Sequence, residues 1–550
     1  MFRICCYITS LMRSAPKALT ALFTIFVALL LLHAPLLRLP YFWDEAGYYI
    51  PAALDFYRAW MLIPKTTLPV GHPPLVMIYL GLAWRLLGYS AWAARGAMTL
   101  IAAATVATLY RLGRRVASPE VAAWSALLLA LSPLFFAQST LVHLDLAATL
   151  FTTLVVLFLI GDQSWLFALA ASLAVLSKET AVVLLPVAWL YAWRRGRGSA
   201  AARRASPASW AALAAPLVPL AAWALHYHHV TGYWTGNRGY LSYNLYSTLS
   251  PARVFWSLLR RSYELFIGGF NWLLTAGAAV GFGWERRGTG HGTRDTGETQ
   301  KPKETRDGQL GTRDSGETRV ACRVSRVPCS VSRAPGFIFL TASLMTVYLL
   351  LLSLVGGAIL PRYLLPVLPL FYLVAVHLVT RLPHFPARLI LAVAAACFAW
   401  AWFINPPYPF PFEDNLAYAD FVRLHEQSAR FLETQPGQPR ILTAWPATDE
   451  LSKPFLGYVA RPLRVTPVQG FAPQELASVP PESFDLVYLY SRKWEPPGNW
   501  VTRFPGWLRV QGRYFDYQPQ VATQVLVARY HLRLLAEMEQ RGQWVRIYSH

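Results

Sequence analysis

Long apolar runs, separated by short polar segments that carry arginines, fill most of the first 405 residues. An α-helix needs about 20 apolar residues to cross the roughly 30 Å of hydrocarbon in a bilayer. About eleven runs qualify as spans or as short limbs of spans. They lie near residues 18–38, 90–110, 121–142, 146–161, 165–177, 180–193, 210–230, 262–284, 336–357, 364–380 and 388–405. The pattern predicts an α-helical polytopic membrane domain over residues 1–405.

The composition supports this interpretation. Hydrophobic residues make up 55% of the chain and charged residues only 14%, against about 25% charged in a soluble protein. A soluble enzyme, a fibrous protein and a disordered chain are thereby excluded. The net charge of +21 would suit a nucleic-acid partner, but the basic residues lie between apolar runs, as the positive-inside rule expects. We expect a membrane protein with no nucleic-acid partner.

Basic clusters predict the orientation. The clusters expected on the cytoplasmic side are Arg111, Arg114 and Arg115; Arg194, Arg195, Arg197, Arg203 and Arg204; and Arg381 with Arg388. The first apolar run has no small-residue cleavage site at its end, so we interpret it as an uncleaved first span that starts in the cytoplasm. Parity then puts residues 406–550 outside. The stretch 165–193 satisfies the positive-inside rule if it forms two short limbs. The tip between them, Lys178-Glu179, should then lie below the outer membrane surface, and a charge at that depth is by default interpreted as a functional site.

Two segments differ from the apolar pattern. Residues 285–335 are polar, and the sequence at 292–299 recurs at 311–318 with one change. We expect a disordered cytoplasmic insertion there; a basic nucleic-acid tail is the alternative, against which the interspersed acids argue.

The second segment is the polar C-terminal region, residues 406–550. Its pattern predicts a small extracytoplasmic α/β domain. The expected helices are 415–434 and 531–541, and the expected strands are 440–445, 463–466, 484–490, 522–528 and 544–548.

An acidic pair opens the first outer loop, residues 39–89, in the sequence Tyr-Phe-Trp-Asp44-Glu45-Ala-Gly-Tyr-Tyr. Adjacent helical residues point about 100° apart, so only one of the two carboxylates can aim directly into a given cavity. Such a group suits a base that takes a proton from an acceptor hydroxyl. The alternative is a helix N-terminus where acids meet the dipole. Farther along, His72 in Gly-His-Pro-Pro-Leu faces a site or caps the helix predicted at 76–87.

Further candidates lie at the outer ends of other spans. His143 and Asp145 stand between the third and fourth spans, where the acid serves a site or is simply solvated. Arg362-Tyr363 begins the tenth span: the guanidinium can hold a phosphate through two hydrogen bonds, or the pair anchors the interface. Arg238 and its neighbouring tyrosines in loop 231–261 are weaker candidates. Jointly, acids and cations on one side describe a site that binds an anionic lipid headgroup and activates a nucleophile.

These motifs together resemble the GT-C superfamily of integral-membrane glycosyltransferases, particularly the bacterial relatives of protein O-mannosyltransferases and the aminoarabinose transferase. The resemblance covers roughly residues 20–405 without the insertion. It rests on Trp43-Asp44-Glu45-Ala-Gly-Tyr-Tyr, Gly71-His72-Pro-Pro-Leu, Ala94-Arg95, Asp145, Ser177-Lys178-Glu179-Thr180 and Arg362-Tyr363-Leu-Leu-Pro. It implies transfer of a sugar from a polyprenyl-phosphate donor to a lipid, glycan or protein acceptor, commonly with inversion, at the outer face of a bacterial inner membrane.

The resemblance also implies residue roles. Asp44 is the expected base, with Glu45 supporting it and Asp145 positioning hydroxyls. Lys178, Arg362 and Tyr363 would bind the donor phosphate, whose charge grows as the glycosidic bond breaks. The further substrate-binding candidates are His72, Arg95, His143 and Arg238. Some relatives bind a divalent metal, but two separated aspartates do not define a ligand set.

The alternative function is a polytopic transporter or lipid flippase, in which intramembrane charges would form a substrate path. The sequence shows no internal repeat of two related halves, and the acids lie in an outer loop rather than at the midplane. Both features favour the glycosyltransferase.

Overall fold

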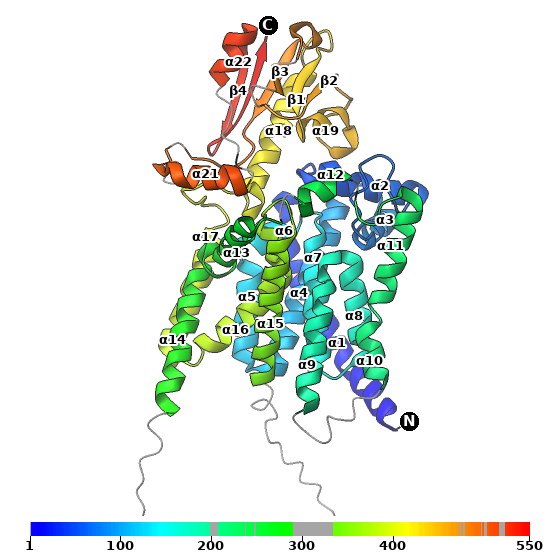
Figure 1. The fold of residues 1–550 in the computed structure, drawn as a ribbon, viewed down its shortest axis with the longest axis vertical. Coiled ribbons are helices and arrows are strands. Elements are labelled where there is room, and N and C mark those ends of the chain that lie inside the picture. The colour runs from blue at the N-terminus through cyan, green and yellow to red at the C-terminus, as the bar shows by residue number, and fades with distance from the viewer. Residues whose placement is uncertain are drawn as a thin grey trace, which may run out of the picture.

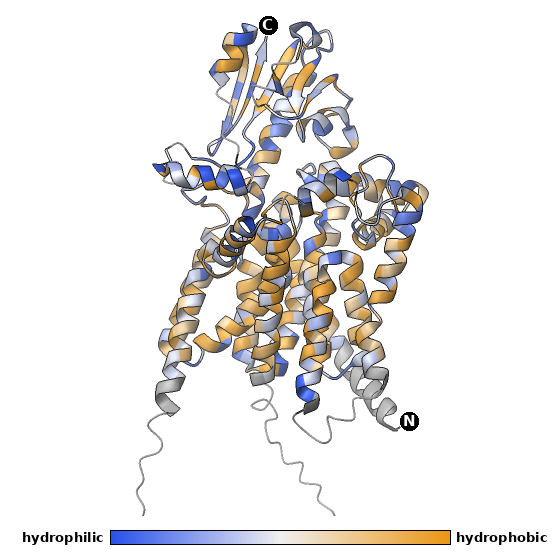
Figure 2. Ribbon diagram, in the orientation of Figure 1, coloured by the Kyte–Doolittle hydropathy of each residue, from blue (hydrophilic) through white to orange (hydrophobic). Residues whose placement is uncertain are grey.

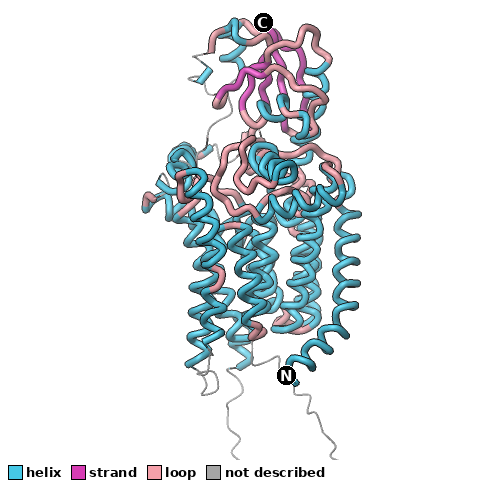
Figure 3. The backbone as a smooth tube through the Cα atoms, turned by 90° about the vertical axis from the view of Figure 1, so that its right-hand side faces the viewer, coloured by secondary structure: helices cyan, strands magenta, loops and turns pink. Residues whose placement is uncertain are grey.

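The computed structural model describes residues 2–197, 207–236, 238–246, 249–289, 334–471, 475–476, 479–496, 498–499, 503–515, 517 and 523–550. Most helices run roughly along one axis, and a small sheet-containing domain covers the end of the bundle away from the N-terminus (Figure 1). The strands are confined to that domain (Figure 3). The middle of the bundle is coloured mainly as hydrophobic residues (Figure 2). Side chains such as Phe23 and Val218 are 66% and 70% exposed, as a surface that faces lipid requires.

Helices occupy or overlap each predicted span. The bundle helices are α1 (Phe2–Leu32), α4 (Ala91–Val116), α5 (Pro119–Leu131), α6 (Pro133–Gln138), α7 (Leu144–Ile160), α8 (Ser164–Ser177), α9 (Leu184–Arg197), α10 (Pro207–Ala214), α11 (Leu217–Thr231), α13 (Pro251–Phe266), α14 (Asn271–Thr289), α15 (Ala334–Leu354), α16 (Leu368–Val379) and α17 (His384–Trp400). Ser90 and Ser118 cap α4 and α5 by accepting hydrogen bonds from Ala93 and Val121, the usual serine role at a helix start.

Within the described residues, four helices are long and apolar enough to cross a membrane: Ala91–Val116, Trp210–Thr231, Gly336–Leu354 and Pro361–Val379. A fifth candidate is the pair Pro251–Phe266 and Gly268–Trp284, bent by 43°. Shorter apolar helices lie at Pro16–Leu32, Leu75–Leu87, Pro119–Leu131, Leu144–Ile160, Ser164–Ser177 and His384–Trp400. The helical, multi-pass character is confirmed, whereas the count of about eleven spans stays a prediction.

Short elements build the end of the bundle next to the C-terminal domain. They are η2 (Glu45–Tyr49), α2 (Ile50–Ala59), α3 (Leu75–Leu87), η3 (Glu179–Val183), α12 (Arg238–Leu241), η7 (Pro361–Val367) and η8 (Phe412–Asp414). At the other end, α14 continues to Thr289 and α15 begins at Ala334. The predicted insertion is therefore helical at its two edges, and the rest of it, residues 290–333, lies outside the described residues.

The C-terminal region forms one five-stranded sheet in the order β2-β1-β3-β5-β4. The strands are β1 (Ile441–Ala444), β2 (Val465–Val468), β3 (Leu486–Tyr490), β4 (Arg533–Gln540) and β5 (Gln543–Ser549). β1 runs parallel to β2 and β3, whereas β5 runs antiparallel to β3 and β4. The long helix α18 (Ala417–Glu433) packs against β4 and β5, and the shorter helices are α19 (Ala447–Ser452), α21 (Pro505–Tyr514) and α22 (Thr523–Tyr530). The predicted small α/β domain is confirmed.

Two predicted elements of this domain are wrong. Residues 522–528 were expected to be a strand, but the described part, 523–528, is helical in α22. Leu526 and Tyr530 of this helix are buried, and Tyr530 packs on Phe484 beside the sheet. Residues 531–541 were expected to be a helix and form β4. Both Arg541 and Gly542 have positive φ, the geometry of a two-residue hairpin, so pairing with β5 overrides the helix-favouring composition of the strand.

Candidate functional site

The acidic motif of the first outer loop is held by the C-terminal domain. Trp43 has a φ of 44°, a left-handed conformation that costs of order 1–3 kcal/mol for such a residue. Its ring packs 5.6 Å from Phe421 and 5.5 Å from Trp445, and these contacts hold the conformation. Asp44 then precedes η2 with its side chain 20% exposed. The side chain of the following residue, Glu45, bonds instead to the backbone of Phe42 and Val142.

Arg362 is the centre of the site. It lies in η7, its side chain is 2% exposed, and it donates hydrogen bonds to Asp44 and, at 2.5 Å, to Glu413. His143 Nε2 lies 3.2 Å from the Arg362 group that contacts Glu413, and Asp145 lies 3.7 Å from the guanidinium Nε. The structure thus brings together Asp44, Asp145 and Arg362, which the sequence placed on one side of the membrane.

Lys178 completes this group from the tip between α8 and η3. Its ammonium donates a 2.6 Å hydrogen bond to Asp145 and lies 4.0 Å from the ring centre of Tyr363. Asp145 therefore stands between two cations. A buried carboxylate is tolerated in a membrane bundle when it is paired in this way.

A third cation lies near the same ring. Arg261 of α13 is 5.8 Å from the centre of the Tyr363 ring, compared with 5.4 Å for Arg362. Arg261 is fully buried, and within the described residues none of its three side-chain nitrogens has a hydrogen-bond partner. A buried guanidinium without acceptors is costly, so this arrangement suits an anionic ligand. Arg261 was not among the candidates predicted from the sequence, because it lies just before the predicted span 262–284 and belongs to none of the motifs.

The side chains of Glu45 and Arg95 form hydrogen bonds with other groups of the protein, not with Asp44. Glu45 is fully buried and accepts hydrogen bonds of 2.7 Å from the backbone N–H groups of Phe42 and Val142, with Arg95 at 3.4 Å. Arg95 donates to the backbone oxygens of Leu39, Pro40 and Thr140. The pair fixes the start of the outer loop; the role of Glu45 in support of Asp44 stays a prediction.

His72 connects the first outer loop to the tip at Lys178-Glu179. Its Nδ1 lies 2.9 Å from Glu179, the residue after Lys178. The residue that caps α3 is Pro74, so of the two alternatives for His72 the helix cap is wrong. Arg238 is exposed on α12.

Glu413 is a site residue for which the sequence gave no role. It lies in η8, on the segment that leads into the C-terminal domain, with its side chain 5% exposed. Burial and the nearby Asp44 raise the pKa of Glu413 to about 7 in spite of the opposing Arg362. Burial and Glu413 together raise the pKa of the adjacent Asp414 well above its ordinary value. The only sequence feature that pointed to Glu413 is that the apolar runs give way to the polar C-terminal region near this residue.

The residues present do not fit a metal ion. Within the described ranges no group of three or more His, Cys, Asp or Glu side chains is arranged to hold one. The acids Asp44 and Asp145 face Arg362 and Lys178, which supply the positive charge that a metal would bring.

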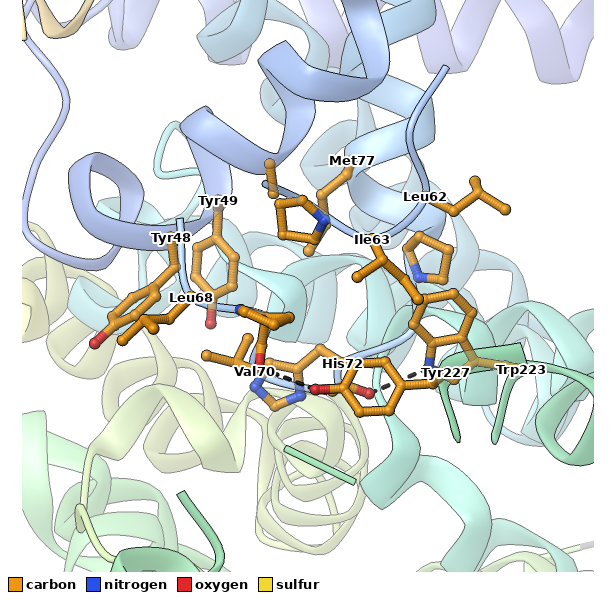
Figure 4. Close-up of a pocket in the computed structure, with 15 residues that line it drawn as sticks. Tyr48, Tyr49, Leu62, Ile63, Leu68, Val70, His72, Met77, Trp223 and Tyr227 are labelled. Carbon is orange, nitrogen blue, oxygen red and sulfur yellow. Dashed lines mark hydrogen bonds between the residues drawn. The ribbon is translucent and has the colours of Figure 1, made fainter. Parts of the chain in front are cut away.

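An apolar pocket lies beside this cluster (Figure 4). Tyr48 and Tyr49 reach it from η2, His72 from the loop, and Trp223 and Tyr227 from α11. Trp223 and Tyr227 donate hydrogen bonds to the backbone oxygens of Gly71 and Pro69. Gly71 is needed here, because its φ is 79° and a Cβ would lie 2.4 Å from the Gly236 nitrogen. Only 22% of the α10–α11 span is buried, so the pocket lies between the bundle core and a helix that faces lipid.

A helical membrane bundle under a small α/β domain is the architecture expected from the resemblance to the GT-C superfamily. Residues 71–225 match a family model described as Dolichyl-phosphate-mannose-protein mannosyltransferase. The chain is similar to the crystal structure of ArnT from Cupriavidus metallidurans in the apo state, with 15% identity, a TM-score of 0.53, and coverage of 96% of this chain and 98% of that chain.

The ArnT structure bound to undecaprenyl phosphate gives 13% identity, a TM-score of 0.50 and coverage of 97% of each chain. No curated protein sequence matches the chain. The resemblance to the GT-C superfamily is confirmed at the level of the fold. The matched segment contains His72, Arg95, His143, Asp145 and Lys178.

Proposed function

We propose that the protein transfers a sugar from a polyprenyl-phosphate donor to a lipid, glycan or protein acceptor at the outer face of a bacterial inner membrane. The observation that carries the proposal is the group of three cations around Tyr363, namely Lys178, Arg261 and Arg362. Two of them already form ion pairs with carboxylates, whereas Arg261 has no hydrogen-bond partner within the described residues, and Glu264 acts on it only through its charge. A donor phosphate would supply the missing anion.

The reaction follows from the placement of Asp44. Asp44 would accept the proton of an acceptor hydroxyl as its oxygen forms a bond to the anomeric carbon. The bond from that carbon to the phosphate oxygen breaks, and the polyprenyl phosphate leaves with the electron pair. Attack opposite the leaving group inverts the anomeric carbon. Arg261, with Lys178 and Tyr363, would stabilise the negative charge that develops on the phosphate, while Arg362 fixes the orientation of Asp44.

The apolar pocket supports a lipid-linked donor. Its aromatic lining connects the vicinity of Tyr49 with the lipid-facing helix α11. The first isoprenoid units of a donor suit such a lining, because apolar surface gains free energy when it leaves water. The similar fold of ArnT, which has been crystallised with undecaprenyl phosphate, agrees with this class of ligand. For a transporter, by contrast, the charges would line a path, whereas here they pair tightly at one end of the bundle.

The first test is the Asp44→Asn variant. Purified protein in lipid nanodiscs would be given a panel of radiolabelled polyprenyl-phosphate sugars and candidate acceptors. We expect wild-type turnover with at least one donor, and a loss of about 10²–10⁴-fold in the variant because the base is removed. The Asn side chain keeps the size of Asp44, so the variant should still fold.

The matched control is Asp162→Asn. Asp162 is 61% exposed and pairs with Arg195 at the far end of the bundle, so this variant should turn over like wild type. Wild-type turnover by Asp44→Asn would remove Asp44 from the mechanism. A wild-type protein that moves intact lipid across vesicles without releasing polyprenyl phosphate would support the transporter instead.

A further inference from the structure

Glu413 accepts a hydrogen bond from one amino group of Arg362, an arginine of the predicted phosphate site. The guanidinium gives one amino group to Asp44 and the other to Glu413. A phosphate that approaches either of these amino groups must share it with the carboxylate there or replace that carboxylate; the remaining donor, Nε, has no hydrogen-bond partner within the described residues and lies 3.7 Å from Asp145. Asp44 is needed in place if it acts as the base, so Glu413 is the partner that can be exchanged.

We propose that Glu413 competes with the donor phosphate for Arg362, so that the segment entering the C-terminal domain regulates how tightly the donor binds. The inference rests on the proposed function only in taking the ligand to be a lipid-linked phosphate. It makes Glu413 a positioning residue, because Glu413 acts on the ligand through the Arg362 guanidinium.

The surroundings of Glu413 explain why its charge is easily lost. Arg362 of η7 attracts its negative charge, but Asp44 of the outer loop and Asp145 of α7 oppose it. Its Oε1 is buried and has no hydrogen-bond partner within the described residues. Around Arg362, three carboxylates thus meet the two cations Arg362 and Lys178. An entering phosphate adds a further negative charge, and protonation of Glu413 removes one.

The backbone keeps Glu413 at this position independently of its charge. Gln138 of α6 donates a 3.3 Å hydrogen bond to the Glu413 carbonyl oxygen, and the same Gln138 contacts His143 at 2.6 Å. Residues on both sides, Phe412 and Asn415, are buried. Loss of the Glu413 proton or charge therefore changes the contact with Arg362 without releasing the segment.

The pH dependence has a definite sign. Because the pKa of Glu413 is raised to about 7, the carboxyl is about nine-tenths neutral at pH 6 and about one-tenth neutral at pH 8. The neutral form leaves Arg362 available. If only this form admits the phosphate, the apparent affinity scales with its population. Donor affinity then falls as pH rises, by at most about tenfold between pH 6 and pH 8.

The test measures binding of the methyl ester of undecaprenyl phosphate, a phosphodiester that stays singly charged over this range and cannot donate a sugar. Its Kd would be determined by intrinsic tryptophan fluorescence in nanodiscs at pH 6, 7 and 8. We expect the wild-type Kd to rise up to about tenfold from pH 6 to pH 8. Glu413→Gln should bind at every pH as wild type does at pH 6.

Two variants control for structural effects. Glu413→Asp keeps an ionisable group and should keep the rise in Kd. Asp414→Asn changes the adjacent buried carboxyl, for which no contact with Arg362 is found among the described residues, and should also keep it. A Glu413→Gln variant with the wild-type rise, or a wild type with no rise, would overturn the inference.

The outcomes separate this inference from the proposed function. If the wild type transfers sugar but its Kd does not depend on Glu413, the function stands and the inference falls. If the Kd behaves as expected but no polyprenyl-phosphate sugar is turned over, the regulation of phosphate binding stands and the transferase proposal falls.

Discussion

Two buried arginines of α13 differ in their partners, and the difference predicts opposite effects on stability. Arg261 has no hydrogen-bond partner within the described residues, whereas Arg253 donates to the backbone oxygens of Gly357 and Tyr514. Replacing a buried charge that has no hydrogen-bond partner by an apolar side chain of similar length removes a desolvation cost. Replacing a well-bonded one leaves acceptors unsatisfied, at about 1–3 kcal/mol.

We therefore expect Arg261→Met to unfold at the same or a higher temperature than wild type, yet to weaken phosphodiester binding by at least about tenfold. Arg253→Met, the matched control, should unfold at a lower temperature. Thermal unfolding followed by tryptophan fluorescence and the Kd measurement check both. If Arg261→Met is destabilised and binds normally, Arg261 serves the fold and has no part in phosphate binding.

The sequence predicted part of this site because membrane parity places distant residues on one side. Asp44, Asp145, Lys178 and Arg362 follow different apolar runs, and counting crossings brings their side chains to one end. Glu413 and Arg261 could not be predicted in this way. Their significance depends on which groups lie within hydrogen-bonding distance after folding, and no spacing along the chain contains that information.

At the scale of elements, η2 and the segment before α19 approach each other closely at Gly47. A Cβ on Gly47 would lie 2.8 Å from the Trp445 ring, and the same ring packs on Trp43 and Tyr48. The contact joins the C-terminal domain to the residues on both sides of Asp44. Glycine is therefore required in the motif Asp44-Glu-Ala-Gly47 for packing rather than for chemistry.

We expect Gly47→Ala to destabilise the protein by about 1–3 kcal/mol through overpacking and to lower sugar transfer by displacing Asp44. Trp445→Leu removes the ring that the new methyl group meets. In that background the further cost of Gly47→Ala should be smaller, and a double-mutant cycle of thermal unfolding measures the coupling. Additive effects of the two substitutions would show that the close contact is absent in solution.

The elements also show where sequence patterns lose their value. The bundle helices and α18 were predicted because an apolar run or an amphipathic face extends over many residues. The two errors, α22 and β4, lie in short segments whose residues suit either state. The Arg541-Gly542 turn and the pairing of Met538 with Val545 favour a strand over a helix in β4. Both depend on β5, which comes later in the chain.

At the scale of the whole molecule, the C-terminal domain acts as a cover on the outer loop. Tyr458 donates to the Tyr41 carbonyl oxygen, Tyr89 donates to that of Phe455, and the hydroxyls of Thr140 and Tyr418 lie 3.0 Å apart. These contacts tie the domain to three separate segments of the bundle. An acceptor must therefore reach Asp44 from the side of the domain or through its displacement, since the domain covers the site from the end.

The orientation of this assembly in the membrane can be tested by reporter fusions. The end of α14 lies at the end of the molecule opposite to the C-terminal domain (Figure 1). The last turns of α9 and α4, which carry Arg195 and Arg115, lie at the same end. From the positive-inside rule we expect that end to be cytoplasmic. A fluorescent-protein fusion at Gly288, on the expected cytoplasmic side, should therefore be bright. An alkaline phosphatase fusion at Gln438, an exposed residue between α18 and β1 on the opposite side, should be active. Fusions at both positions that report the same side would refute the orientation. Fusions that report the reverse order would place the donor site on the cytoplasmic face and require a donor made and used there.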